Sequence, residues 1–136
     1  MEMKPLPRLN AINRPFFEAC NRGTMELQQC AAPACRRFIY YPRVCCPYCG
    51  GGVLAWRPVS GRGRIAGFTV VHRPQHASFR AEAPYAFVAV TLDEGPLLYS
   101  RLVEPVPPGV DVTERPVRAV FVDHAPGWKL PFFALA

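Results

Sequence analysis

Residues 30–49 read CAAPACRRFIYYPRVCCPYC and contain five of the six cysteines of this 136-residue chain. Four of them form two pairs, Cys30 with Cys35 and Cys46 with Cys49, at the two ends of a short aromatic and basic segment. Paired thiolates at these spacings are typical of structural zinc sites, in which four sulfur atoms surround one tetrahedral ion. We therefore predict a zinc ribbon with these four cysteines as the metal ligands.

The second pair is the more regular one, because Cys46 and Cys49 belong to a Cys-Pro-x-Cys-Gly turn. Backbone N–H groups face the sulfur atoms in such a turn, and Gly50 supplies the positive φ that it needs. Cys45 is then a spare cysteine, although its position next to Cys46 would let it substitute as a ligand. The first pair is separated by four residues, Pro33 among them.

A Cys-x-x-Cys sequence also occurs in thiol oxidoreductases, so a redox site built on Cys45, Cys46 and Cys49 is an alternative. The second pair of cysteines nearby favours a filled four-sulfur site with no open coordination position. We expect the ion to be structural and to carry out no chemistry.

The start of the chain, MEMKPLPRLN, lacks the apolar core of a signal peptide, and no apolar run approaches the roughly 20 residues that cross a bilayer. We therefore expect a cytoplasmic, soluble protein with no membrane segment. In that compartment clustered cysteines bind metal more often than they form disulfides.

Sixteen prolines and ten glycines disfavour long helices and favour short strands joined by turns. One short helix is predicted over residues 14–22, with Asn13 as its N-cap and Gly23 after its end. Its adjacent rings, Phe16 and Phe17, point in different directions, and we expect both in the core. Elsewhere the pattern is β.

After the ribbon, the sequence predicts five or six strands over about 80 residues, an arrangement typical of a small barrel of the oligonucleotide/oligosaccharide-binding (OB) type. A β-sandwich is the alternative. A strand from about 64 to 72 alternates with Ala66, Phe68 and Val70 on one face. The other expected features are a strand before an SGRG turn, a polar loop over 73–83, a hairpin turning at 93–96, and strands in VRAVFVDH and KLPFF. The expected domains are the arm and helix at 1–26, the ribbon at 27–52 and the barrel at 53–136.

The formal charge of +6 is concentrated in the first part of the chain. Residues 1–80 carry twelve Lys and Arg against three acids, whereas residues 81–136 carry four against seven. Arginines near the SGRG turn suit a phosphorylated ligand or an acidic partner, or they merely solvate the outer face of the barrel. These residues are Arg57, Arg62, Arg64 and Arg73.

No catalytic set is recognisable. Paired carboxylates and a nucleophile with a base are missing from the pattern, and Pro74 separates His72 from His76 so that they do not share a helix. The SGRG segment has no lysine and no following helix, and is interpreted as a β-turn rather than a phosphate loop. We expect no catalytic residue in this chain.

The order of motifs resembles the zinc-ribbon/OB-fold proteins that partner thiolase-like enzymes, and the resemblance covers residues 14–134. The first knuckle departs from the usual Cys-x-x-Cys-Gly of that family. The matching motifs are the helix Pro15-Phe16-Phe17-Glu18 ending at Gly23, Pro-Arg-x-x-Cys-Pro-x-Cys-Gly from Pro42 to Gly50, SGRG, TVVHRP from Thr69 to Pro74, and APYxxxxVxLDEG.

The resemblance implies an N-terminal helical segment, a rubredoxin-like zinc ribbon and a C-terminal OB barrel. It implies a non-catalytic subunit, in a hetero-oligomer with a thiolase, acyltransferase or aldolase that carries the catalytic residues, where it helps to form an acyl-CoA channel. Structural Zn²⁺ and a shared acyl-CoA are the implied cofactors, with Cys30, Cys35, Cys46 and Cys49 as ligands. Contact with CoA or the partner is expected at Arg57, Arg62, Arg64, His72 and Arg73.

A rival interpretation is a protein that binds single-stranded nucleic acid, because OB barrels and zinc ribbons both serve that purpose and the isoelectric point is near 9.3. The alanine- and valine-rich barrel strands and the acidic second part of the chain disfavour it.

Overall fold

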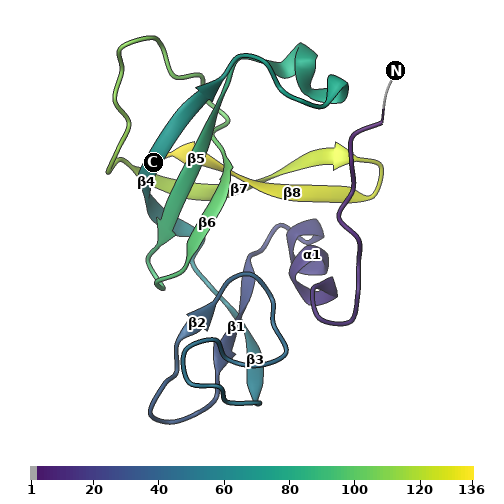
Figure 1. Ribbon diagram of the computed structural model, residues 1–136, viewed down its shortest axis with the longest axis vertical. Helices are drawn as coiled ribbons and strands as arrows, with labels where there is room; N and C mark the ends of the chain where they lie inside the picture. Colours follow the sequence, from purple (N-terminus) through teal and green to yellow (C-terminus); the bar gives the residue numbers. More distant parts are fainter. Residues whose placement is uncertain (1–2) are drawn as a thin grey trace.

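The computed structural model describes residues 3–136, so the first two residues of the expected N-terminal arm lie outside it. One short α-helix, a 3₁₀ helix and eight strands make up the described part (Figure 1). In chain order they are α1 (Arg14–Asn21), β1 (Glu26–Cys30), β2 (Phe38–Ile39), β3 (Leu54–Pro58), β4 (Arg62–Val71), η1 (Ala77–Glu82), β5 (Tyr85–Leu92), β6 (Leu97–Arg101), β7 (Pro116–Ala125) and β8 (Trp128–Leu135).

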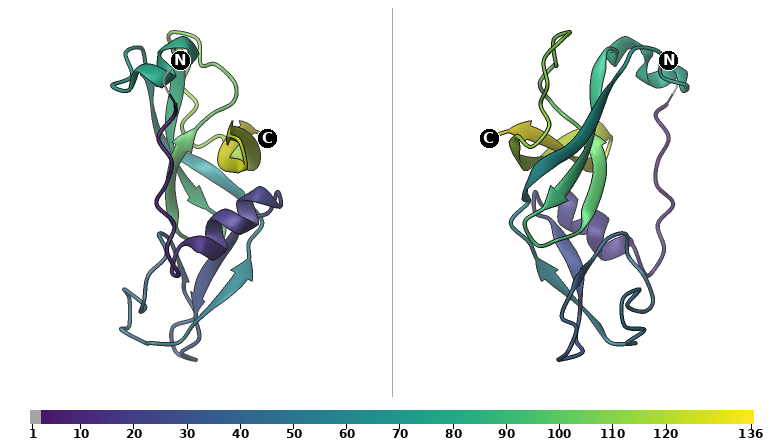
Figure 2. Two further views of the ribbon diagram at one scale, coloured as in Figure 1. Left: turned by 90° about the vertical axis from the view of Figure 1, so that its right-hand side faces the viewer. Right: turned by 60° about the vertical axis from the view of Figure 1, so that its left-hand side comes forward.

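The strands form two antiparallel sheets that lie at opposite ends of the long axis of the molecule (Figures 1 and 2). The smaller has the order β2-β1-β3 and carries the cysteines, and the larger has the order β6-β5-β4-β7-β8. A parallel bridge between Leu102 and Phe133 brings the end of β6 against β8, so the larger sheet curls toward closure. The mainly β prediction is confirmed, with an OB barrel rather than a sandwich.

Strand β3 pairs along its whole length with β1, from Glu26 opposite Pro58 to Cys30 opposite Leu54. Residues 54–58 lie in the range that the sequence analysis expected to form the barrel, but their hydrogen bonds join them to the cysteine-bearing sheet. The division into arm with helix, ribbon and barrel stays a prediction. The pairing of β3 with β1 would place the boundary between ribbon and barrel after Pro58 rather than after residue 52.

Helix α1 lies between the two sheets and contacts both (Figure 1). The Phe16 ring packs edge-on against Tyr40 of the ribbon, with 5.6 Å between centroids, and the Phe17 ring packs against Trp128 of β8 at 5.8 Å. Both phenylalanines are buried, as predicted. Because the two adjacent rings diverge, a helix of only eight residues joins the ribbon to the barrel.

The expected side-chain cap of this helix is wrong. Asn13 occupies the N-cap position but makes no side-chain hydrogen bond to the helix. Its Oδ1 accepts from the amide of Asn10, and its Nδ2 donates to the Arg8 carbonyl and the Tyr41 hydroxyl. The buried amide is used to fasten the preceding arm and the ribbon instead.

A β-bulge in β4 overturns the expected placement of Ala66 with Phe68. Ile65 pairs with Val90 and Gly67 pairs with Ala89, so Ala66 is an extra residue in the ladder. Such an insertion reverses the alternation of the strand beyond it. Ala66 is therefore exposed, while Ile65 is fully buried and Phe68 packs against the core.

The segment 73–83, expected to be an irregular loop, contains η1. The His76 ring accepts from the amide of Ser78 and so caps the first turn, a role that no period in the sequence indicates. The expected hairpin turn at 93–96 is confirmed, with the Leu92 amide donating to the Pro96 carbonyl and Gly95 at φ 119°. In the described residues, no helix combines the length and apolar character needed to span a bilayer.

Candidate metal centre and basic surfaces

Four cysteine sulfur atoms meet where β1 and the two knuckle loops come together. The Sγ atoms of Cys30, Cys35, Cys46 and Cys49 all lie within 4.8 Å of one another. Cys30 and Cys49 sulfurs are 3.5 Å apart and those of Cys35 and Cys46 are 3.7 Å apart. Zinc–sulfur bonds of about 2.3 Å in a tetrahedron place the sulfurs about 3.8 Å apart, so the donor set fits Zn²⁺.

The second knuckle also has the backbone donors expected of a thiolate turn. The Tyr48 amide lies 3.4 Å from Cys46 Sγ, and the Gly51 amide lies 3.4 Å from Cys49 Sγ. Burial raises the pKa of Cys46, but hydrogen bonds from the Cys49 and Tyr48 amides outweigh it and lower the pKa to about 7. Amide donors therefore favour the charged, metal-binding form of this sulfur.

Cys49 responds in the opposite sense. The Gly51 amide lowers the pKa of this thiol, whereas the thiol of Cys30 and burial raise it, with a net pKa of about 11. Hydrogen bonds between neighbouring thiols contribute to both shifts, because they lower the pKa of Cys46 and raise that of Cys49. A divalent ion that binds the four sulfurs displaces their protons.

Cys45 lies outside the cluster and is exposed. Gly51 closes the other side of the sulfurs, since a Cβ on it would lie 3.3 Å from Cys49 Sγ and 3.6 Å from Cys30 Sγ. Four protein donors and close packing leave no position for a substrate, which is the arrangement of a structural site. The residues 3–136 hold no second group of three or more metal-binding side chains.

Thiol reactivity offers a direct check of this assignment. With zinc bound, we expect a single fast-reacting thiol toward Ellman's reagent at neutral pH, that of the exposed Cys45. Cys20 should react only after unfolding, because it is fully buried and burial raises its pKa to about 12. A chelator should release the four ligand thiols, and Cys45→Ser should remove the fast phase alone. Several fast thiols in zinc-loaded protein would contradict the assignment.

The predicted basic set divides into two groups that the structure holds apart. Arg57 lies on β3, and Arg62 and Arg64 lie at the start of β4, where the Arg64 guanidinium donates to the Glu114 carbonyl at 3.1 Å. His72 follows the end of the same strand. At about 3.3 Å per residue, Arg64 and His72 are about 25 Å apart, so one small ligand does not contact both groups.

His72 and Arg73 instead line a hollow of about 430 Å³ together with Pro74 and Arg80. Arg80 comes from η1 and is not among the predicted site residues. It reaches the same hollow as His72 through a helical turn that no hydrophobic period in the sequence reveals. The hollow collects three side chains that donate hydrogen bonds, so its chemistry suits an anionic group.

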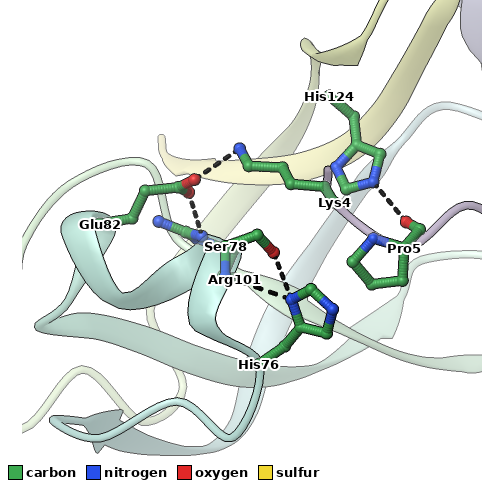
Figure 3. Close-up of polar contacts among 7 residues, drawn as sticks. All are labelled: Lys4, Pro5, His76, Ser78, Glu82, Arg101 and His124. Atoms are coloured by element: carbon green, nitrogen blue, oxygen red, sulfur yellow. Dashed lines mark hydrogen bonds and ion pairs between the residues drawn. The ribbon is translucent and has the colours of Figure 1, made fainter. Parts of the chain in front are cut away.

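On the end of the barrel remote from the cysteines, the N-terminal arm crosses the surface and is held by ionic contacts (Figure 3). Glu82 pairs with Lys4 at 2.5 Å and with Arg101 at 2.8 Å, and the Pro5 carbonyl lies 2.8 Å from His124 Nε2. Burial raises the pKa of Glu82, but Lys4 and Arg101 outweigh it and hold that pKa below its usual value. These residues are remote in sequence, so no motif predicted their contact.

The histidines form no catalytic arrangement in the described part of the chain. His76 bonds to Ser78, at 2.6 Å between Nδ1 and Oγ, within its own turn. His124 stacks on Phe79 and reaches the arm. Neither is oriented by a carboxylate, so a base with a nucleophile and an orienting acid is not assembled among residues 3–136.

A cysteine-bearing ribbon of three strands, a linking helix and a five-stranded OB barrel define the class of this protein as a two-part OB-fold protein. Sequence and structure comparisons give the family. Residues 56–122 match the family model of the C-terminal OB-fold domain of ChsH2. A chain of the solved Ltp2-ChsH2(DUF35) aldolase superposes with a TM-score of 0.82 at 32% identity, over 96% of this chain and 98% of that one. The protein belongs to the family of zinc-ribbon and OB-fold proteins that includes the ChsH2 DUF35 domain.

Curated relatives extend the comparison. A probable enoyl-CoA hydratase alpha subunit from Thermomonospora curvata is 33% identical over 133 residues, which is 96% of this chain and 40% of that protein. A DUF35 domain-containing scaffold protein from Methanothermobacter thermautotrophicus is 33% identical over 85 residues, 61% of this chain and 62% of that protein. The chain thus spans about two fifths to three fifths of these relatives' lengths.

Proposed function

We propose that this protein is a non-catalytic accessory subunit of a thiolase-superfamily enzyme, an acyltransferase, thiolase or retro-aldolase. The observation that carries the proposal is the match along nearly the whole chain to a component of a two-part aldolase, at a TM-score of 0.82. The described residues assemble no catalytic set of their own, and the relative from Methanothermobacter thermautotrophicus is named a scaffold protein.

Zinc has a structural part in this proposal. Cys30, Cys35, Cys46 and Cys49 would hold one Zn²⁺, which cross-links β1 to both knuckle loops and replaces the large core that a sheet of three short strands lacks. Leu27 of β1 belongs to the main core, but the buried set on the cysteine side of the sheet is small, consisting of Ile39 with two of the cysteines. The ion would therefore supply much of the free energy that orders the ribbon.

We infer a place for acyl-CoA at the hollow formed by His72, Arg73 and Arg80, where the phosphate groups of the ligand would be neutralised. The protein would then form one wall of the acyl-CoA channel, and the partner would supply the reacting groups. Arg62 and Arg64 lie at the opposite end of β4 from His72, and we assign them, together with Arg57 of β3, to partner contact.

Co-expression with a thiolase-like protein encoded beside it provides the test. We expect the two chains to purify together and to elute as one large complex at micromolar concentration. The complex, and not the isolated accessory subunit, should carry the acyl-CoA-dependent activity. Two separate peaks would contradict the proposal, and so would turnover of an acyl-CoA by this chain alone.

A further inference from the structure

Hydrophobic side chains are exposed on the loop that carries the second knuckle. Val44 is 72% exposed and Tyr48 is 52% exposed, and they lie within five residues of each other. Neither side chain belongs to the hydrophobic core. Exposed apolar groups gathered on one loop of a soluble protein commonly mark an interaction site.

The same loop region is strongly basic. The 55 residues from 27 to 81 contain eight arginines and no Asp or Glu. Arg37 and Arg43 are exposed in the ribbon, and the Arg37 guanidinium lies 4.6 Å from the centroid of the Tyr48 ring. Because the ribbon contains no acidic side chain beyond Glu26, these arginines have no carboxylate partner within it, and their charge is available to a negatively charged surface.

The loop that carries Val44 is fixed to β1 by hydrogen bonds. Gln28 of β1 is 5% exposed, and its side-chain amide bonds twice to the backbone of Arg43. Its Nε2 donates to the Arg43 carbonyl at 2.8 Å, and its Oε1 accepts from the Arg43 amide at 2.8 Å. A buried amide that uses both of its groups fixes the adjacent Val44, and a fixed apolar anchor loses little entropy on binding.

We propose that the face formed by Arg37, Arg43, Val44 and Tyr48, the knuckle face, docks on an acidic and partly apolar surface of the thiolase-like subunit. This inference rests on the proposed function and names the surface through which it would operate. Val44 and Tyr48 act as anchors, and the arginines steer encounter and select the partner by charge.

The observations favour a protein over a nucleic acid as the occupant. A single strand binds by stacking bases on aromatic rings along a basic groove. Here the most exposed anchor is aliphatic, and the Tyr48 ring is already occupied on one face by Arg37. An acidic protein surface with an apolar centre matches both kinds of group.

A second exposed apolar patch provides the matched control. Phe87 and Tyr99 stack on the outer face of the barrel with their ring centroids 5.8 Å apart, and Tyr99 is 62% exposed. Tyr99→Asp and Val44→Asp each place one new carboxylate at an exposed apolar position, one on the barrel and one on the knuckle face. Any effect of added charge as such should be equal in the two variants.

The experiment measures binding of full-length protein to the purified thiolase-like subunit at ionic strengths of about 50 mM and about 300 mM. We expect the association rate of the unchanged protein to fall at the higher salt. Val44→Asp and Arg37→Glu should each weaken binding about tenfold or more, whereas Tyr99→Asp should stay within about twofold. Zinc content and thermal unfolding, measured on each variant, confirm that the fold is retained.

The outcomes separate the two proposals. If the unchanged protein forms no complex, the accessory function itself fails. If it does form one, and the knuckle variants bind as well as the unchanged protein, this inference is overturned, and a loss of binding in Tyr99→Asp would then place the docking face on the barrel. Tighter binding of a single-stranded oligonucleotide than of the partner, lost in the same knuckle variants, would also overturn it.

Discussion

Replacing Cys46 by serine is expected to reduce zinc from one ion per chain to less than about a tenth of that, and to disorder the ribbon. Cys46 is buried, its sulfur lies 3.7 Å from that of Cys35, and the Tyr48 amide donates to it. Structural zinc contributes about 10–16 kcal/mol in isolated zinc-finger peptides, far more than this small sheet gains from its own core. Metal analysis and amide hydrogen exchange over residues 26–58 measure the two effects.

Cys45→Ser is the matched control, because it removes a thiol from the neighbouring residue. Cys45 is exposed and outside the sulfur cluster, so this variant should keep one zinc and unchanged exchange protection. The opposite pattern, with zinc retained by Cys46→Ser and lost by Cys45→Ser, would show that the second knuckle uses the other cysteine. The barrel should stay folded in both variants, because most of the residues in the main core come from it.

Gly63→Ala is expected to lower the free energy of unfolding of the barrel by about 3 kcal/mol. Gly63 is buried in β4, and a Cβ on it would overlap the carbonyl oxygen of Thr91 and lie 2.9 Å from Val90 Cγ1. Both atoms belong to the paired strand β5, whose backbone does not move aside without breaking the ladder. Urea denaturation followed by circular dichroism measures the change in midpoint.

Gly67→Ala tests whether the loss comes from the close approach or merely from replacing a strand glycine. Gly67 lies four residues further along the same strand, its φ is not left-handed, and a Cβ there would meet nothing within 4 Å. We expect its stability to change by less than about 1 kcal/mol. Equal destabilisation by both substitutions would mean that the contact with Thr91 is not the cause.

The role of Gly63 also revises the interpretation of the SGRG segment. The segment is predicted to be a turn, and the Ser60 amide donates to the Glu94 carboxylate in the connection between β5 and β6. Gly63 is present for a different reason, because it lets β4 and β5 approach each other. A glycine that serves close packing and a glycine that serves a turn look the same in one sequence.

Predictions that rest on local chemistry agree with the structure. The Asp93–Pro96 turn needs only its own residues, and the helix at Arg14–Asn21 follows from Pro15 and Gly23. The spacing of the cysteines predicted a cluster, and the four named sulfurs do lie together. Each of these features is decided within a few residues, so the sequence pattern carries it.

Predictions that depend on what a segment packs against disagree with the structure. The bulge at Ala66 depends on the register with β5, and the buried Asn13 bonds to the arm and to Tyr41 rather than to its own helix. The basic set likewise appeared continuous in sequence, yet an extended strand separates Arg64 from His72. The distance between two residues of a β-strand grows by about 3.3 Å with each residue between them, whereas residues in a turn stay close.

By itself the sequence determined the mainly β character, the cysteine cluster, the turn positions and the order of motifs that indicates the family, because each depends on residue type and short spacing. Only the tertiary structure decided that β3 belongs to the cysteine-bearing sheet, that Arg80 joins His72 and Arg73, and that Gln28 holds the exposed Val44 loop in place. These contacts join elements through long-range pairing and burial. Their energies depend on the partner that the folded chain brings near, which no single segment encodes.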